Sequence, residues 1–116
     1  MPCYRINRLA DDVRILGRVI GKEEEAQEYI SYYQKYLDEV QRRLKEIKVK
    51  VRTYAEGYGD YKAVSKGSGA YTMLGMAGVD NIAGDKPIPY PEVSPEWVVI
   101  ENPEAVSYTH LTLPTN

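Results

Sequence analysis

The chain has 116 residues, 28% of them charged, with a formal net charge of −2, so it has room for one small domain with a modest core. Because both signs of charge are mixed, the composition favours neither a nucleic-acid partner nor an anionic membrane surface. No segment reaches the roughly 20 apolar residues of a membrane-spanning helix. Tyrosine is abundant, at 11 residues beside one Trp and no Phe, which suits wet clefts and half-buried helix faces alike.

Cys3 and His110 are the single cysteine and the single histidine. A lone cysteine permits no disulfide within the chain, and no apolar segment precedes Cys3 as it would in an export signal. A lone histidine has no partner for a metal site. We therefore interpret Cys3 as incidental and predict neither a metal site nor a cofactor.

The first half of the chain predicts two helices. Residues 7 to 20 carry apolar side chains at helical spacing, with Asn7 as the expected N-cap and a break at Gly21. Residues 22 to 48 predict one long helix with an acidic start and a basic end. Its apolar stripe consists of Ala26, Ile30, Tyr33, Leu37, Val40, Leu44 and Ile47. We favour a face packed on a globular partner, and a short coiled-coil seam is the alternative.

The second half predicts an α/β unit. Ser94 is the expected N-cap of a helix that begins at Pro95. The order helix, strand, helix, strand indicates a parallel pair of strands. The predicted elements are a strand over residues 48 to 54, a loop to residue 69, a helix over 70 to 77, a proline-punctuated connection, a helix over 95 to 102 and a strand within NPEAV.

Short motifs for nucleotides or catalysis are incomplete. GYGDYK begins like a dinucleotide fingerprint, but Lys62 stands where a third glycine belongs, and KGSG lacks the Lys-Ser/Thr of a P-loop. The acids of the loops have no nucleophile or metal partner in the sequence, so we predict that the chain is not an enzyme. These acids are Glu56, Asp60, Asp80 and Asp85.

The last residues, 107 to 116, break with the pattern before them. Read as codons, VSYTHLTLPT resembles the transposon end used in tagmentation sequencing libraries. We therefore interpret residues 107 to 116 as a non-native tail on a truncated reading frame, with a genuine short tail as the alternative.

Several segments, taken in their order along the chain, resemble the iron-siderophore, haem and cobalamin class of substrate-binding proteins of ABC transporters. These segments are DDVRILGRVIGKEEEAQEYI, GSG, AGVDNIAGD, PYPEVSPEW and NPEAV, within residues 5 to 106. The resemblance implies two α/β lobes bridged by one long helix, with the ligand held between the lobes. Residues 1 to 21 would then end the N-terminal lobe, residues 22 to 48 would form the bridge, and residues 49 to 106 would begin a Rossmann-like C-terminal lobe.

The resemblance also implies roles for individual residues. Tyr90 stands where relatives place an aromatic residue that packs on the ligand, with a place over the lobe core as the alternative. Glu96 matches an acidic residue that pairs with arginines of the membrane permease, and a first-turn acid also stabilises its helix. The loop after the first strand also contacts ligand in relatives, and here it carries Tyr58, Tyr61, Lys66 and Ser68.

The function implied is that of an extracytoplasmic protein that captures an iron chelate (siderophore or haem) or a corrinoid and delivers it to an ABC importer. Two other functions stay open. One is a helical dimerisation module built on the apolar stripe, and the other is an intracellular ligand-sensing domain that shares this lobe.

Trp97 and Ile100 are expected in the core.

Overall fold

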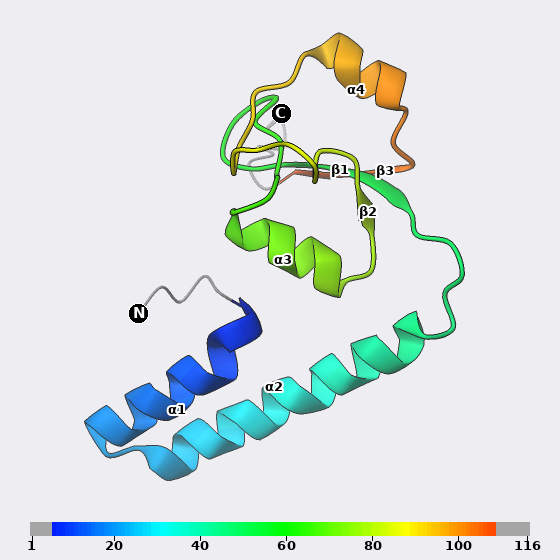
Figure 1. Cartoon of the computed structure of the whole chain (residues 1–116). Helices are drawn as coiled ribbons and strands as arrows, with labels where there is room; N and C mark the ends of the chain where they lie inside the picture. Colours follow the sequence, from blue (N-terminus) through cyan, green and yellow to red (C-terminus); the bar gives the residue numbers. More distant parts are fainter. Residues whose placement is uncertain (1–5, 109–116) are drawn as a thin grey trace, which may run out of the picture. The chain divides into compact units, whose positions relative to one another are not determined.

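The computed structural model describes residues 6–108 and divides the chain into two units, Met1–Lys48 and Val49–Asn116 (Figure 1). Among the described residues, the first unit contains helices and no strand, whereas the second combines helices with a small sheet. Cys3, His110 and the predicted tail from residue 109 onward lie outside the described residues. None of the helices within residues 6–108 is long and apolar enough to cross a membrane.

The first unit contains a 3-10 turn, η1 (Ile6–Arg8), followed by α1 (Leu9–Ile20) and α2 (Glu23–Leu44). The prediction that Asn7 caps the first helix is wrong, because Asn7 lies inside η1 and α1 starts two residues later without a side-chain cap. Gly21 ends α1 in the left-handed conformation, with φ of 70°, as its lack of a Cβ permits.

The two helices approach closely at Gly17, which is buried. A Cβ atom at Gly17 would lie 2.5 Å from the Cβ of Ala26 on α2, so only glycine fits there. Within the apolar stripe, Ile30 is buried and the Tyr33 hydroxyl donates a hydrogen bond to the Ile6 carbonyl (3.2 Å). Towards the end of the stripe Val40 is exposed, so α1 covers only the first part of it.

The second helix is shorter than predicted. It ends at Leu44, and the amides of Glu46 and Ile47 then bond to carbonyls three residues back, which is the geometry of a tightening turn. The β-branched residues Ile47 and Val49 follow, and such side chains favour extended backbone over helix.

The second unit is built on a three-stranded parallel sheet of order β2-β1-β3. Its strands are β1 (Arg52–Glu56), β2 (Asp80–Asn81) and β3 (Ala105–Tyr108), and its helices are α3 (Gly69–Met76) and α4 (Pro95–Glu101). Figure 1 shows the two helices on opposite sides of the strands. The predicted α/β class with a parallel pair is confirmed.

The three strands differ from the predictions. β1 spans residues 52–56 rather than 48–54, because its pairing with β2 and β3 begins at Arg52 and continues to Glu56. β2 lies in the segment predicted as a connection, because a two-residue strand leaves no periodic pattern to read. β3 runs past residue 106 into the predicted tail, with Ser107 and Tyr108 paired to Ala55 and Glu56 of β1. The strands β1 and β3 are joined by backbone hydrogen bonds, so many side chains are compatible with an extension of β3.

Tyr54 of β1 lies at the centre of the core, which Trp97 and Val98 of α4 cover. The predicted cap of α4 is confirmed, since the Ser94 hydroxyl accepts a hydrogen bond from the Trp97 amide (3.1 Å). The prediction that Ile100 is buried is wrong, because its side chain is 78% exposed. A helix only seven residues long has one inward face, and Trp97 and Val98 occupy it.

Candidate ligand-binding site

Two loops meet beyond the carboxyl end of β1, the edge at which parallel α/β sheets bind ligands. One loop, residues 57–68, follows β1, and the other, residues 82–94, follows β2. Backbone hydrogen bonds of 2.9 to 3.0 Å join the loops. They run from the Ala63 amide to the Pro91 carbonyl, from the Ser65 amide to the Pro89 carbonyl and from the Val93 amide to the Tyr61 carbonyl.

An aromatic pair stands on these joined loops. The rings of Tyr58 and Tyr90 meet edge to face, with centroids 5.1 Å apart and an interplanar angle of 70°. Such T-shaped contacts are favourable because the positive edge of one ring meets the negative face of the other. The Tyr90 ring lies against Gly57, where a Cβ atom would come within 2.7 Å of two ring carbons. Tyr58 remains 72% exposed.

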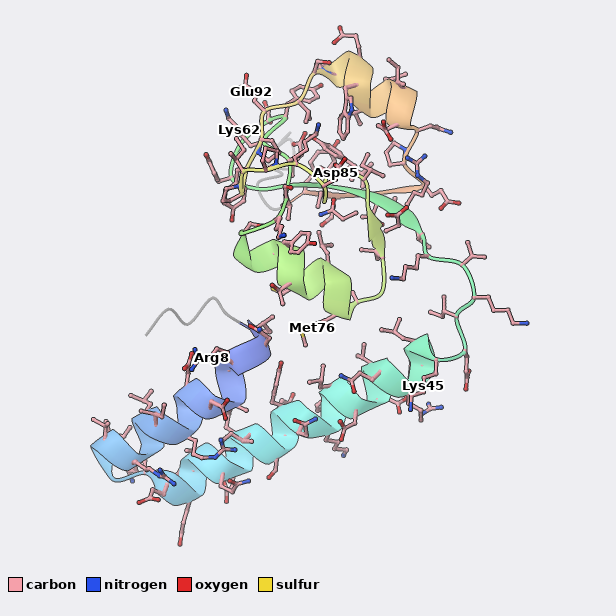
Figure 2. All side chains as sticks on the ribbon, viewed as in Figure 1. Arg8, Lys45, Lys62, Met76, Asp85 and Glu92 are labelled. Atoms are coloured by element: carbon pink, nitrogen blue, oxygen red, sulfur yellow. The ribbon has the colours of Figure 1, made fainter. Side chains whose placement is uncertain are left out.

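An ion pair connects the same two loops. The Lys62 ammonium donates a hydrogen bond to the Glu92 carboxylate, and Figure 2 shows both side chains beside each other. This hydrogen bond raises the pKa of Lys62 and lowers the pKa of Glu92. Because Glu92 is exposed and Lys62 is only half-buried, the pair contributes little to the stability of the fold. Residues 30 positions apart give no sequence signal of pairing, and sequence reasoning did not select Lys62 or Glu92.

A buried carboxylate lies at the base of the site. Glu56, the last residue of β1, is only 3% exposed, and its Oε1 accepts hydrogen bonds from the Tyr54 hydroxyl (2.8 Å) and the Tyr61 amide (3.0 Å). Burial, followed by the hydrogen bond to Glu56, raises the pKa of the Tyr54 phenol above its usual range. Tyr61 has the left-handed φ of 55°, which is uncommon for a residue with a side chain.

Ser68 and Lys66 occupy the start of α3. The Ser68 hydroxyl is buried, donates to the Ser65 carbonyl (2.8 Å) and accepts from the Tyr71 amide (3.1 Å), so it caps the helix. Lys66 is exposed. The structure thus brings Tyr58, Tyr61 and Tyr90 onto two joined loops, whereas the Ser68 hydroxyl is engaged in a helix cap.

Glu96 lies in the first turn of α4 and is exposed. Val99 and Ile100, three and four positions later on the same helix face, are 76% and 78% exposed. The exposed face of α4 therefore carries an acidic side chain next to two apolar ones.

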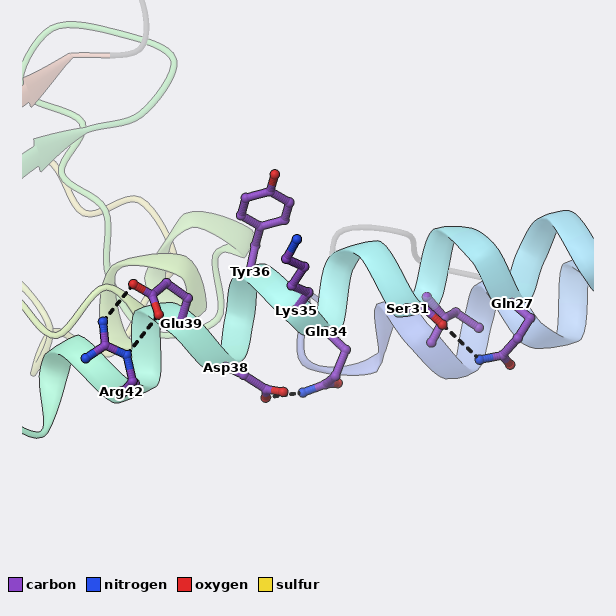
Figure 3. Close-up of a pocket in the computed structure, with 9 residues that line it drawn as sticks. Gln27, Ser31, Gln34, Lys35, Tyr36, Asp38, Glu39 and Arg42 are labelled. Atoms are coloured by element: carbon purple, nitrogen blue, oxygen red, sulfur yellow. Dashed lines mark hydrogen bonds and ion pairs between the residues drawn. The ribbon is translucent and has the colours of Figure 1, made fainter.

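Two hollows lie apart from the aromatic pair. One of about 860 Å³ lies between α3 and β2, with Tyr71, Met76 and Asp85 among its lining residues. Figure 3 shows another along α2, lined by described residues of that helix alone, including Glu39 and its partner Arg42. Within residues 6–108, no buried side-chain polar atom lacks a hydrogen bond, and no group of His, Cys, Asp or Glu could hold a metal ion.

Residues 5–111 match the family described as periplasmic binding protein. The chain belongs to this family. The resemblance found in the sequence is therefore confirmed, and the family consists of solute-binding proteins rather than enzymes. Among curated proteins, no sequence gives a significant match.

Solved structures of periplasmic binding proteins share the fold of this chain. An ABC transporter solute binding protein from Sulfurospirillum deleyianum is 26% identical with a TM-score of 0.80, over 92% of this chain and 35% of its own. The TroA-like periplasmic binding protein FepB from Veillonella parvula is 26% identical with a TM-score of 0.71, over 90% and 33%. The periplasmic vitamin B12 binding protein BtuF of Vibrio cholerae is 19% identical with a TM-score of 0.68, over 85% and 39%. The chain thus spans between 33% and 39% of the length of these relatives.

Proposed function

We propose that this chain is part of an extracytoplasmic solute-binding protein that captures an iron chelate, such as a siderophore or haem, or a corrinoid, and delivers it to an ABC importer. Membership in the periplasmic binding protein family supports the class of function and the location outside the cytoplasm. The observation that carries the proposal is the pair of Tyr58 and Tyr90 beyond the carboxyl end of β1.

The geometry of this pair suits large, rigid ligands. Haem and corrin rings and iron chelates present wide surfaces that aromatic side chains cover well. The Tyr90 ring is held by Gly57 behind it and by Tyr58 at its edge, and its flanking residues Pro89 and Pro91 stiffen the backbone. Because little freedom remains to be lost on binding, the entropic cost of contact is small.

Delivery requires a second surface, and Glu96 supports one on α4. Its carboxylate is exposed, and no ion pair involves it within the described part of the chain. An exposed acid beside apolar side chains suits a partner surface that carries arginine, since charge complementarity speeds encounter and sets register. We assign this partner as the permease of the importer.

A titration with three probes tests ligand capture. Haemin, ferric desferrioxamine B and cyanocobalamin are added to the isotope-labelled chain, and the ring signals of all tyrosines are followed by NMR, which detects weak binding. At least one probe should shift the signals of Tyr58 and Tyr90. Tyr32 and Tyr36 on α2 form a control, because they are two exposed tyrosines whose ring centroids lie 4.8 Å apart.

Two results would contradict the proposal. In the first, none of the three probes shifts any tyrosine signal at millimolar concentration. In the second, Tyr32 and Tyr36 respond as strongly as Tyr58 and Tyr90, which would indicate non-specific stacking on exposed rings.

A further inference from the structure

We infer that Glu56 is a positioning residue for the aromatic pair: its buried carboxylate holds the loop of residues 57–62 in the shape that places Tyr58 against Tyr90. Neither the family match nor the sequence motifs assign a role to Glu56. Glu56 is the last residue of β1, lies directly before Gly57 and is buried.

A carboxylate at 3% exposure needs hydrogen-bond donors around it, because burial of an unpaired charge is costly. Glu56 receives two of them on one oxygen, from the Tyr54 hydroxyl and the Tyr61 amide. The Tyr54 donor belongs to the same strand and to the core. The Tyr61 donor lies across the loop, so Glu56 ties the far end of the loop to the rigid strand.

The backbone conformation of Tyr61 depends on this hydrogen bond to Glu56. Its φ of 55° lies in the left-handed region, which side chains disfavour, so the surrounding contacts must hold it. Its amide is held by Glu56, and its carbonyl accepts the Val93 amide (2.9 Å) from the second loop. The residue thus links β1 to the loop that carries Tyr90.

The loop between these anchors is tight. The Gly57 amide bonds to the Lys62 carbonyl (2.8 Å), and the Lys62 amide bonds to the Gly59 carbonyl (3.1 Å). Tyr58 lies inside this turn, so its ring position follows from the loop shape. If the acceptor at Glu56 is lost, the strained Tyr61 is released and the Tyr58 ring leaves its edge contact with Tyr90.

The test compares substitutions that separate the two hydrogen bonds. Glu56→Leu removes the acceptor for both donors. Glu56→Gln keeps an oxygen that can accept both, and therefore serves as the conservative rescue. Tyr54→Phe removes only the donor from the core and leaves the Tyr61 amide held. Glu56→Asp withdraws the oxygen by one methylene and provides a milder loss if Glu56→Leu does not fold.

Two NMR readouts follow the loop without any ligand. One is the nuclear Overhauser contact between the rings of Tyr58 and Tyr90, and the other is the hydrogen exchange of the Tyr61 amide. Glu56→Leu and Glu56→Asp should weaken the ring contact and speed Tyr61 exchange at least about tenfold, as loss of a protecting hydrogen bond does. Glu56→Gln and Tyr54→Phe should retain both. A folded Glu56→Leu or Glu56→Asp variant that keeps both, or a Tyr54→Phe variant that loses both, would overturn the inference.

The effect of Glu56 on ligand binding rests on the proposed function and is measured in a separate experiment. Where haemin, ferric desferrioxamine B or cyanocobalamin shifts the tyrosine signals of the unchanged chain, Glu56→Leu or Glu56→Asp should weaken that binding by about tenfold, because two freed rings must then be ordered by the ligand. Unchanged affinity would overturn the functional part of the inference. If no probe binds the unchanged chain, the proposed function fails, while the ring contact still decides the role of Glu56.

Discussion

Gly57 lies directly after β1, with the ring of Tyr90 against its backbone. The Tyr90 ring can approach this closely because Gly57 has no side chain: a Cβ atom there would lie 2.7 Å from two ring carbons. The sequence marks Gly57 only as part of a turn, and the contact that requires it comes from a residue on another loop.

Gly57→Ala is therefore expected to push the Tyr90 ring away from β1 and to weaken its contact with Tyr58. Overpacking of this kind costs about 1–3 kcal/mol of stability. Urea denaturation gives the stability, and the ring-to-ring Overhauser contact gives the geometry. Gly59→Ala is the matched control in the same loop, because its Cβ would meet only the Lys62 side chain at an ordinary 3.5 Å. Equal effects of the two substitutions would contradict the argument.

The carboxyl group of Glu39 on α2 provides a pH-dependent test of an ion-pair cluster. Hydrogen bonds from Arg42 and then Arg43 lower the pKa of its carboxyl group from 4.5 to about 2. Since the folded-state pKa is the lower one, the stabilisation is present above about pH 4.5 and is lost as the pH falls towards 2. An NMR titration of the Glu39 carboxyl carbon should show a midpoint well below 4.5, and Arg42→Gln should raise it. A midpoint of 4.5 in the unchanged chain would refute the ion-pair geometry.

The helices α1 and α2 form a close pair because two small residues face each other. Gly17 and Ala26 let the backbones approach, and the Lys22 carbonyl lies 3.0 Å from the place of a Cβ at Gly17. A substitution at Gly17 thus tests whether close packing outweighs the intrinsic preference of a helix for alanine.

Gly17→Ala should destabilise the α1–α2 pair by about 1–3 kcal/mol, because the overpacking exceeds the gain of about 1 kcal/mol in helix propensity. Gly75→Ala within α3 is the matched control, since a Cβ there meets nothing within 4 Å and only the propensity gain remains. Thermal unfolding followed by circular dichroism should thus show opposite signs for the two variants. A stabilising Gly17→Ala would rule out the close helix approach.

In the proposed function, ligand binding and permease docking use different surfaces of the protein. Tyr90 stands on the joined loops and Glu96 on the exposed face of α4. This separation predicts that substitutions of the two residues affect different steps of transport.

In a complete binding protein with its importer, Glu96→Gln should leave ligand affinity unchanged and weaken docking, with a smaller effect at high salt because exposed charges are screened. Tyr90→Ala should do the reverse, with ligand affinity reduced and docking retained. Calorimetry measures the first property, and co-sedimentation with importer vesicles measures the second. If Glu96→Gln reduces ligand affinity while docking stays normal, the two surfaces are assigned the wrong way round.

The chain end provides a further prediction, based on the interpretation of residues 107 to 116 as a non-native tail. If this interpretation holds, deletion of residues 109–116 should leave the free energy of unfolding unchanged within about 0.5 kcal/mol. Deletion of residues 107–116 should cost more, because it also removes the β3 pairs that Ser107 and Tyr108 make with β1. Denaturant midpoints of the two shortened chains decide between these outcomes. A loss above about 1 kcal/mol on the shorter deletion would contradict the interpretation.

Local chemistry in the sequence was sufficient for several elements. The apolar stripe from Ala26 onward predicted α2, and Ser94 followed by Pro95 predicted the start of α4, because helix periodicity and capping involve residues within one or two turns. The order of helices and strands predicted the α/β class for the same reason. Linear motifs also indicated the resemblance to periplasmic binding proteins, and the family match confirmed that resemblance.

The tertiary structure decided what depends on distant residues. The ion pair of Lys62 with Glu92 and the contact of Gly57 with Tyr90 join segments about 30 residues apart, and nothing in the local pattern distinguishes those residues. Trp97 and Ile100 were both expected in the core, but the fold turns Trp97 and Val98 inward and leaves Ile100 exposed. Glu56 looked like one loop acid among several, and only its burial beside Tyr54 and Tyr61 gives it a structural task. Propensity and capping act over a few residues and can be read along the chain, whereas the binding site depends on which loops the sheet brings together.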